Sequence, residues 1–346
     1  MGKTAVILFN LGGPDKAESV EPFLFNLFND KAIIGAPQPI RWCIARLISS
    51  RRAPIAQEIY NQIGGRSPLL KNTEAQATAL EQRLREKLPD DDIKCFISMR
   101  YWHPMSSDTA SRVKAWNPEK VILLPLYPQY STTTTGSSLT DWRQSAKKVG
   151  LLQKTVAVCC YPTNLGFINA IADRLQSVLD EVTDRNTLRV LFSAHGLPKK
   201  IVNRGDPYQW QVEQSVKKIV ENLNLKHLDW ILSYQSRVGP LKWIGPSTDE
   251  VIIDNSKKGK NIIVVPIAFV SEHSETLVEL DIEYKKLAKD NGCKNYIRVE
   301  ALGINKYFIE SLSDLILNKD KHKFNNNLYS PVIRCPSNFT KCPCLN

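Results

Sequence analysis

The sequence contains no uninterrupted apolar run of about 18 residues, the length that a helix needs to cross a bilayer. It also lacks a long block of like charge, of the kind that nucleic-acid-binding tails carry. The first residues, MGKTAVILFNLGG, pass directly into an apolar segment without the regions of a signal or transit peptide. We therefore expect a cytoplasmic protein with no membrane-spanning helix and no nucleic-acid partner.

The chain does have enough apolar material for a substantial core, because 42% of its 346 residues are hydrophobic. This length and composition predict one large or two medium globular units. Basic residues outnumber acidic residues by 46 to 35, which gives a formal net charge of +11. Since no basic tail is present, this excess fits an anionic ligand or an anionic membrane surface.

Short apolar runs alternate with amphipathic helical segments, which is the pattern of buried parallel strands in an α/β sheet. The segments VILLPLYPQYS and IIVVPIAFVS resemble each other, so we expect two similar halves of four strands each, with a boundary near residues 180–187. Ligands collect at the carboxyl ends of such strands. The eight predicted strands are 4–10, 93–99, 120–127, 155–161, 188–194, 228–234, 261–269 and 296–302.

A histidine ends the fifth strand region, in the segment LFSAHGLP. His195 follows apolar residues and precedes a glycine that allows a ligand to approach closely. An unperturbed imidazole has a pKa of roughly 6.5, so it can accept a proton near neutral pH. A structural histidine is the alternative, and the strand-end position favours the functional interpretation.

The segment SEHSETLVELDIEY follows the seventh strand and carries an acidic stripe. Glu275, Glu279 and Glu283 are spaced four residues apart, so on a helix they share one face. Such spacing most often marks a solvated helix face. Here the stripe begins at the ligand-binding end of the sheet and has no basic residue at i+4 before Lys286. It therefore also suits a path for protons or for a loosely held divalent cation such as Fe(II).

Five of the eight cysteines are clustered along the chain. Cys159 and Cys160 are adjacent, and Cys335, Cys342 and Cys344 lie within the last twelve residues, CPSNFTKCPCLN. A disulfide framework is not expected in a cytoplasmic chain. The tail offers three thiolates, whereas an iron–sulfur cluster needs four ligands. Zinc is the alternative metal for these thiolates, although structural zinc sites favour C-x2-C spacing.

Seven segments in register resemble the ferrochelatases, the enzymes that insert ferrous iron into protoporphyrin IX. The segments are LFNLGGP, IGGRSPLL, MRYWHP, LPLYPQYSTTTTGSSL, LFSAHGLP, YQSRVGPLKWIGPSTDE and SEHSETLVELDIEY. The resemblance implies an α/β fold with two Rossmann-like halves, each a four-stranded parallel sheet flanked by helices, around a central cleft. It also implies Fe(II) and protoporphyrin IX as substrates, protoheme and two protons as products, and no nucleotide cofactor.

On this basis we expect an N-terminal half at 1–182 with the porphyrin lip and a C-terminal half at 183–325. The cysteine tail then occupies 326–346. Two alternatives stand beside a protoporphyrin ferrochelatase. One is a chelatase for another tetrapyrrole, such as coproporphyrin or a cobalt-accepting ring. The other is a non-catalytic heme or iron carrier on the same fold, which has no need for an acidic stripe opposite a histidine.

The resemblance also implies roles for individual residues. His195 takes a pyrrole proton or binds the metal, and Glu275 is its acidic counterpart across the macrocycle. Glu279 and Glu283 continue the metal path, and His273 organises the first turn of the helix within the substrate site. The other residues that match family positions lining the porphyrin cleft are Leu11, Arg51, Arg52, Tyr60, Arg100, Tyr101, Tyr127 and Trp243.

Residues 23–48 correspond to the apolar lip of the family. Ile40, Ile44 and Leu47 are interspersed there with basic residues, a pattern that also suits a core-facing helix. An apolar rim with cationic neighbours favours docking on an anionic membrane. We therefore expect peripheral association with the inner membrane face. Both a monomer and a homodimer are compatible with the sequence.

Some ferrochelatases, in animals and in certain bacteria, bind an iron–sulfur cluster through three C-terminal cysteines and one from the body of the chain. The resemblance thus implies a two-iron two-sulfur cluster on Cys335, Cys342 and Cys344. The loop that supplies the body ligand in animals has Thr132 here. We therefore expect the fourth ligand at Cys159 or Cys160, with Cys160 preferred.

Overall fold

The chain forms two compact units in the computed structural model, which describes residues 2–225, 227–318, 328–329 and 334–345. Unit 1 comprises 1–160 with 312–330, and unit 2 comprises 161–311 with 331–346. Within the described ranges, no helix is long and apolar enough to cross a membrane.

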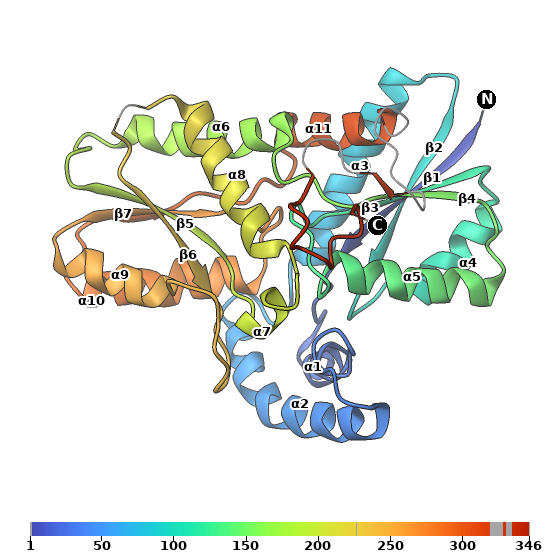
Figure 1. Cartoon of the computed structure of the whole chain (residues 1–346), viewed down its shortest axis with the longest axis horizontal. Helices are drawn as coiled ribbons and strands as arrows, with labels where there is room; N and C mark the ends of the chain where they lie inside the picture. Colours follow the sequence, from blue (N-terminus) through green and yellow to red (C-terminus); the bar gives the residue numbers. More distant parts are fainter. Residues whose placement is uncertain (1, 226, 319–327, 330–333, 346) are drawn as a thin grey trace. The chain divides into compact units, whose positions relative to one another are not determined.

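Unit 1 is built on a parallel sheet with strand order β2-β1-β3-β4-β9. The strands are β1 (Lys3–Asn10), β2 (Asp92–Met99), β3 (Lys120–Pro125), β4 (Lys154–Val158) and β9 (Leu328–Tyr329). The helices are η1 (Ala17–Ser19), α1 (Val20–Phe28), α2 (Gln38–Asn61), α3 (Leu69–Lys87), α4 (Ser106–Trp116) and α5 (Thr135–Val149). Figure 1 shows α3 on one face of this sheet and α4 and α5 on the other.

Unit 2 contains a second parallel sheet, with strand order β6-β5-β7-β8. The strands are β5 (Leu188–His195), β6 (Trp230–Gln235), β7 (Asn261–Pro266) and β8 (Tyr296–Arg298). The helices are α6 (Leu165–Glu181), α7 (Lys199–Val202), α8 (Tyr208–Leu223), α9 (Thr248–Lys257), η2 (Glu275–Glu283), α10 (Tyr284–Asp290) and α11 (Lys306–Leu317), whose last residues belong to unit 1. In Figure 1, α6 and α8 lie on one face of this sheet and α9 and α10 on the other.

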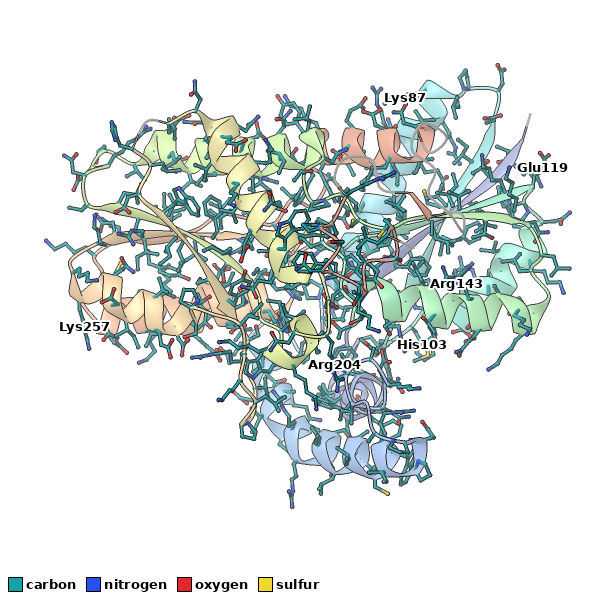
Figure 2. The ribbon with its side chains drawn as sticks, in the orientation of Figure 1. Lys87, His103, Glu119, Arg143, Arg204 and Lys257 are labelled. Carbon is teal, nitrogen blue, oxygen red and sulfur yellow. The ribbon has the colours of Figure 1, made fainter. Side chains whose placement is uncertain are left out.

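All eight predicted strands are present, and the α/β class with four such strands in each unit is confirmed. Their runs are continuously apolar because helices cover both faces of each sheet. In unit 1 Phe9 packs with Trp142, and in unit 2 Leu191 packs with Val264. Charged side chains such as Arg143 of α5 and Lys257 of α9 lie on the outer surface of their helices (Figure 2).

The units differ from the expected segments in two respects. The expected boundary at 182 lies inside unit 2, because α6 packs against α8 of the second half. The expected tail at 326–346 is divided between the units: β9 adds a fifth strand to the first sheet by pairing with β4, and 334–345 belong to unit 2. A two-residue strand carries no apolar run by which the sequence reveals it.

Candidate functional site

Strands β5 and β6 of unit 2 end side by side, because His195 pairs with Gln235 in parallel register. Gly196 follows, and a Cβ atom at this glycine would lie 2.9 Å from the carbonyl oxygen of Gln235 and 3.3 Å from the ring of Trp243. A larger residue would therefore collide with the neighbouring strand. The glycine has a packing role, which the sequence interpretation in terms of ligand approach did not include.

The acidic segment after β7 forms a π-helix, η2, which begins at Glu275. Helices of this type are rare and occur frequently at functional sites. Glu275 and Glu279 are half-buried, and both approach the hydroxyl of Ser236, so they share one face of the helix. Glu283, at the last position, is exposed. The predicted stripe therefore has two inner acids and one outer acid.

His195 and Glu275 form a hydrogen-bonded pair in which Nδ1 of the imidazole lies 2.9 Å from Oε2 of the carboxylate. The expectation that Glu275 faces His195 across the macrocycle is corrected by this contact, because atoms at that separation leave no room for a ring between them. Nε2 of His273 lies 3.7 Å from the same oxygen. Its Nδ1 is buried without a hydrogen-bond partner among the described residues.

The carboxylate of Glu279 is held by four donors. It accepts hydrogen bonds from the backbone N–H of Ser236 at 2.8 Å, from Nε2 of Gln235 at 3.0 Å and from the hydroxyl of Tyr284 at 2.9 Å. The hydroxyl of Ser236 is the fourth donor. Ser236 adopts a left-handed conformation, with φ of 63°, that aims both of its donors at Glu279. Backbone strain at a non-glycine residue is typical of functional sites.

The two inner acids have pKa values shifted in opposite directions. Burial alone would raise the pKa of Glu275, but the charges and hydrogen bonds of His195 and His273 outweigh it and hold that pKa well below the ordinary value. Burial and the negative charge of Glu275 raise the pKa of Glu279. Such divergence separates an ionised carboxylate from one that holds its proton more readily.

The pKa of His195 is raised above the ordinary histidine value. Burial opposes the charged form and would lower this pKa, but the charge and hydrogen bond of Glu275, together with the charge of Glu279, outweigh it. The hydroxyl of Tyr208 donates to the carbonyl oxygen of His195 at 2.9 Å, which holds the backbone at the strand end. Sequence reasoning missed Tyr208, whereas Glu275, the acid that pairs with His195, lies in the predicted stripe.

In unit 1, two of the predicted porphyrin contacts, Arg100 and Tyr101, share one hydrogen-bonded network. The guanidinium of Arg100 lies 3.0 Å from the carboxylate of Asp30 and donates to Ser137 at 2.7 Å. The hydroxyl of Tyr101 donates to Asp30 at 2.7 Å, and its side chain is 1% exposed. Tyr101 therefore packs in the interior, which differs from the expectation that its ring lines a cleft. Asp30 is a member that the sequence interpretation missed.

The other predicted contacts of unit 1 vary in exposure. Tyr60 is buried and packs in the cluster that contains Tyr101, with Leu11 half-buried against it. Tyr127 is half-buried, and burial raises the pKa of its phenol. Arg51 is exposed, and its neighbour Arg52 stacks over a phenylalanine ring.

The lip residues lie mainly on α2, which exposes large apolar side chains. Ile40 is 56% exposed and Leu47 is 52% exposed, while Ile44 is half-buried. Arg46 is exposed, as expected of a basic neighbour. Arg41 is instead buried, with its guanidinium donating to the carbonyl oxygens of residues 29 and 36. An ordinary core-facing helix would bury these apolar side chains, so α2 differs from that alternative.

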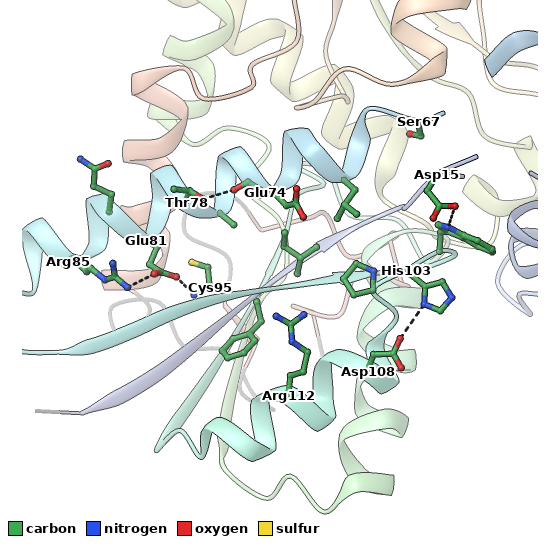
Figure 3. Close-up of a pocket in the computed structure, with 18 of the residues that line it drawn as sticks. Asp15, Ser67, Glu74, Thr78, Glu81, Arg85, Cys95, His103, Asp108 and Arg112 are labelled. Carbon is green, nitrogen blue, oxygen red and sulfur yellow. Dashed lines mark hydrogen bonds and ion pairs between the residues drawn. The ribbon is translucent and has the colours of Figure 1, made fainter. Parts of the chain in front are cut away.

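Unit 1 also contains a groove of about 1130 Å³ between α3 and α4, beside the edge strand β2. Figure 3 shows His103 paired with Asp108 at one end, and Glu81 contacting Arg85 and the backbone of Cys95 at the other. None of the predicted site residues lines this groove. The groove is therefore separate from Glu275 and Glu279, which lie on η2 in unit 2.

The cysteine tail packs on unit 2 near the start of α8. Within 334–345, the only fully buried side chains are those of Cys335, Cys342 and Cys344. Nε2 of Gln211 donates to Sγ of Cys335 at 3.2 Å. Cys160, which belongs to unit 1, is also buried. The other side chains of 334–345 are half-buried or exposed. Among the described residues, no group of three or more His, Cys, Asp or Glu side chains is placed so that it could hold a metal ion.

The chain is similar to known proteins over nearly its whole length. A family model described as ferrochelatase matches residues 3–320. The ferrochelatase of Pelagibacter ubique is 61% identical over 344 residues, which cover 99% of each chain. The ferrochelatase of Caulobacter vibrioides is 49% identical over 342 residues, which cover 99% of this chain and 97% of the relative.

Solved structures share the architecture at low sequence identity. SirB from Bacillus subtilis with Fe3+ aligns with a TM-score of 0.51 and 12% identity, over 91% of this chain and 95% of that chain. The sirohydrochlorin chelatase SirB in complex with cobalt, from Bacillus subtilis subspecies spizizenii, also has a TM-score of 0.51 and 12% identity, over 91% and 94%. This likeness concerns the chelatase-like α/β fold alone.

Proposed function

The chain belongs to the ferrochelatase family, a ferro-lyase family of heme biosynthesis, and we propose that His195 and Glu275 carry out its insertion of Fe(II) into protoporphyrin IX. The observation that carries this proposal is the 2.9 Å contact between Nδ1 of His195 and Glu275 at the end of β5. Strand ends of open α/β sheets are where such folds bind their ligands.

The reaction releases two pyrrole protons while a dication enters the ring. Neutral His195 accepts one proton at Nε2, because Nδ1 is the nitrogen that faces Glu275. Glu275 then stabilises the imidazolium and fixes the orientation of the ring, as a carboxylate does for a catalytic histidine. Its negative charge also attracts ferrous iron, the substrate metal. Glu279, whose pKa is raised, is suited to accept the second proton.

The remaining site residues divide by exposure. Glu283 lies at the outer end of the acidic stripe and is suited to meet the metal first, and His273 supports Glu275 from the neighbouring turn. Arg100 and Tyr101 act by positioning through the Asp30 network, and Tyr60 packs in the same cluster as Tyr101. The residues proposed to contact the porphyrin directly are Leu11, Arg51, Arg52, Tyr127 and Trp243.

The tail cysteines are proposed to ligate a two-iron two-sulfur cluster together with Cys160. Support comes from the burial of all four thiols and from the hydrogen bond that Gln211 donates to Cys335. When bound, such a cluster supplies iron–thiolate cross-links between the tail and the body of the chain.

The protein is proposed to act in the cytoplasm and to dock on the inner membrane face through α2. Support comes from the exposed apolar residues of this helix, of which Ile55, at 64% exposure, extends the lip beyond the predicted segment. Exposed arginines on the same helix suit anionic headgroups.

An anaerobic assay tests the proposed function. The purified chain is mixed with ferrous iron and protoporphyrin IX, and the Soret band is followed. Multiple turnovers per chain are expected. A carrier would instead stop at one equivalent, and faster turnover with coproporphyrin, or with cobalt and another ring, would favour a related chelatase.

A further inference from the structure

The π-helix η2 has an uncommon geometry that needs support from its neighbours. Rarely adopted backbone geometries persist where the surrounding structure holds them. Inner acids Glu275 and Glu279 both lie on this element. Their positions relative to β5 and β6 therefore depend on what fixes η2 to the sheet.

Strand β8 supplies two side chains that contact this region. Tyr296 and Arg298 are two residues apart on the strand, so they project from the same face. The hydroxyl of Tyr296 donates to the carbonyl oxygen of Leu280 at 2.7 Å. The contact ties the middle of η2 to the edge of the sheet.

Arg298 makes the stronger contact, because it binds carboxylates on both sides of the inner acids. Its Nε and Nη2 atoms donate to the two oxygens of Asp281 at 2.8 Å and 2.6 Å, a bidentate pair. Its Nη1 atom donates to Glu272 at 2.6 Å. The side chain is only 8% exposed, so solvent screens these contacts weakly. A planar guanidinium suits this geometry, which a lysine cannot reproduce.

Glu272 precedes Glu275 by three residues, and Asp281 follows Glu279 by two. The two acids held by Arg298 thus bracket the catalytic portion of η2. Glu272 also accepts a hydrogen bond from the backbone N–H of Ala301 at 2.8 Å, which anchors it to the segment after β8.

We propose that Arg298 is a positioning residue, which sets the placement of Glu275 and Glu279 by clamping η2 at Asp281 and the segment before η2 at Glu272. This inference rests on the proposed roles of the two inner acids. No residue of the clamp needs to touch the substrate for it to act. Loss of such supporting contacts typically lowers activity about 10- to 100-fold in sites where outer partners orient the reacting groups.

The test compares three variants of the full chain in the anaerobic insertion assay. Arg298→Met is expected to lower kcat about 10- to 100-fold while the KM for protoporphyrin changes less than about threefold. Asp281→Asn removes the charge from the bidentate half but leaves the contact with Glu272, so a smaller loss of kcat in the same direction is expected. Arg298→Lys is expected to fall between wild type and Arg298→Met.

Arg189→Met is the matched control, because Arg189 is a partly buried arginine of the same sheet, paired with Asp229 at 2.8 Å. It is expected to lose thermal stability while retaining kcat. A folded Arg298→Met protein with kcat within about twofold of wild type overturns the clamp. If Arg298→Met does not fold, an unchanged kcat in Asp281→Asn overturns it. Glu275→Gln distinguishes failure of the proposed function from failure of the clamp. Full activity in Glu275→Gln contradicts the proposed function. A large loss of activity in Glu275→Gln, with normal activity in Arg298→Met, contradicts only the clamp.

Discussion

The imidazole of His195 has one nitrogen committed to the protein and one left to meet a substrate. Nδ1 faces Glu275 at 2.9 Å, so in the proposed mechanism Nε2 is the nitrogen that accepts the proton. The raised pKa of this histidine means that the pair must lose a proton before it can act as a base. The environment of one residue thus fixes both the direction of proton transfer and its pH dependence.

Replacement of the histidine tests its role directly. In His195→Ala, insertion activity is expected to fall by about 10²–10⁴-fold, the usual contribution of a general base. The fold should persist, because the side chain is 37% exposed at the end of a strand. Activity and circular dichroism are measured on the same preparation. His227→Asn, at an exposed loop position, is the control and should remain active. Near-normal turnover in folded His195→Ala contradicts the assignment.

The pH dependence of activity follows from the raised pKa. Below that pKa His195 is protonated and cannot accept a pyrrole proton, so kcat/KM should rise with pH through an acid limb above about 6.5, the ordinary histidine value. Glu275→Gln removes the stabilising charge and should move this limb to lower pH. An identical limb in both proteins would show that Glu275 does not control His195.

The same pair makes two stabilising contributions, whose dependences on pH have opposite signs. The contribution of His195 is complete below about 6.5 and is lost as pH rises through its raised folded pKa. The contribution of Glu275 is present above about 4.3 and is lost as pH falls through its lowered folded pKa. Urea unfolding at a series of pH values measures both effects.

At the scale of the element, the C-terminal tail packs through its cysteines. Cys342→Ser is expected to remove visible absorption between roughly 300 and 550 nm from anaerobically purified protein and to lower its melting temperature, because a thiolate ligand is lost. Iron and sulfide analysis accompanies the spectra. Cys43→Ser, at an exposed cysteine of unit 1, is the control. A wild-type protein that is colourless, free of iron and sulfide, and fully active contradicts the cluster while leaving the chelatase assignment in place.

Helix α2 presents its apolar side chains to the surface, and this predicts membrane binding. Ile40→Glu with Leu47→Glu should weaken sedimentation with anionic vesicles at least tenfold, because buried apolar area and anionic attraction both contribute about 1 kcal/mol or more per residue. Leu152→Glu, at a site that is 90% exposed in the segment between α5 and β4, should have no effect. Equal binding by the wild type, the Ile40→Glu/Leu47→Glu variant and Leu152→Glu would contradict docking through α2.

The type of a helix is harder to predict than its existence. The acidic spacing predicts a helix from Glu275, and the helix is present. Its π geometry could not be predicted from periodicity, because a spacing of four residues suits both an α-helix and a π-helix. Arg298 was missed for a related reason. It contacts acids 17 and 26 residues earlier in the chain, and no local pattern links them.

At the scale of the whole molecule, the strands were predictable because parallel strands buried on both faces are continuously apolar. The predicted strand 261–269 is three residues longer than β7, which ends at Pro266, because apolar loop residues follow the strand. The pairing of His195 with Glu275 was not predictable, because 80 residues and two strands separate them. Only the parallel register of β5 with β6 and β7 brings the strand ends together.

The most direct measurement of the central claim compares Glu275→Gln with Glu283→Gln in anaerobic insertion of ferrous iron into protoporphyrin IX. Both changes remove one charge from the same π-helix and preserve side-chain size, but only Glu275 contacts His195. The account predicts that Glu275→Gln loses kcat by about 10²-fold or more, whereas Glu283→Gln, at an exposed position, loses much less. Equal losses at both positions, accompanied by equal losses of thermal stability, would contradict it and assign the stripe to stability alone.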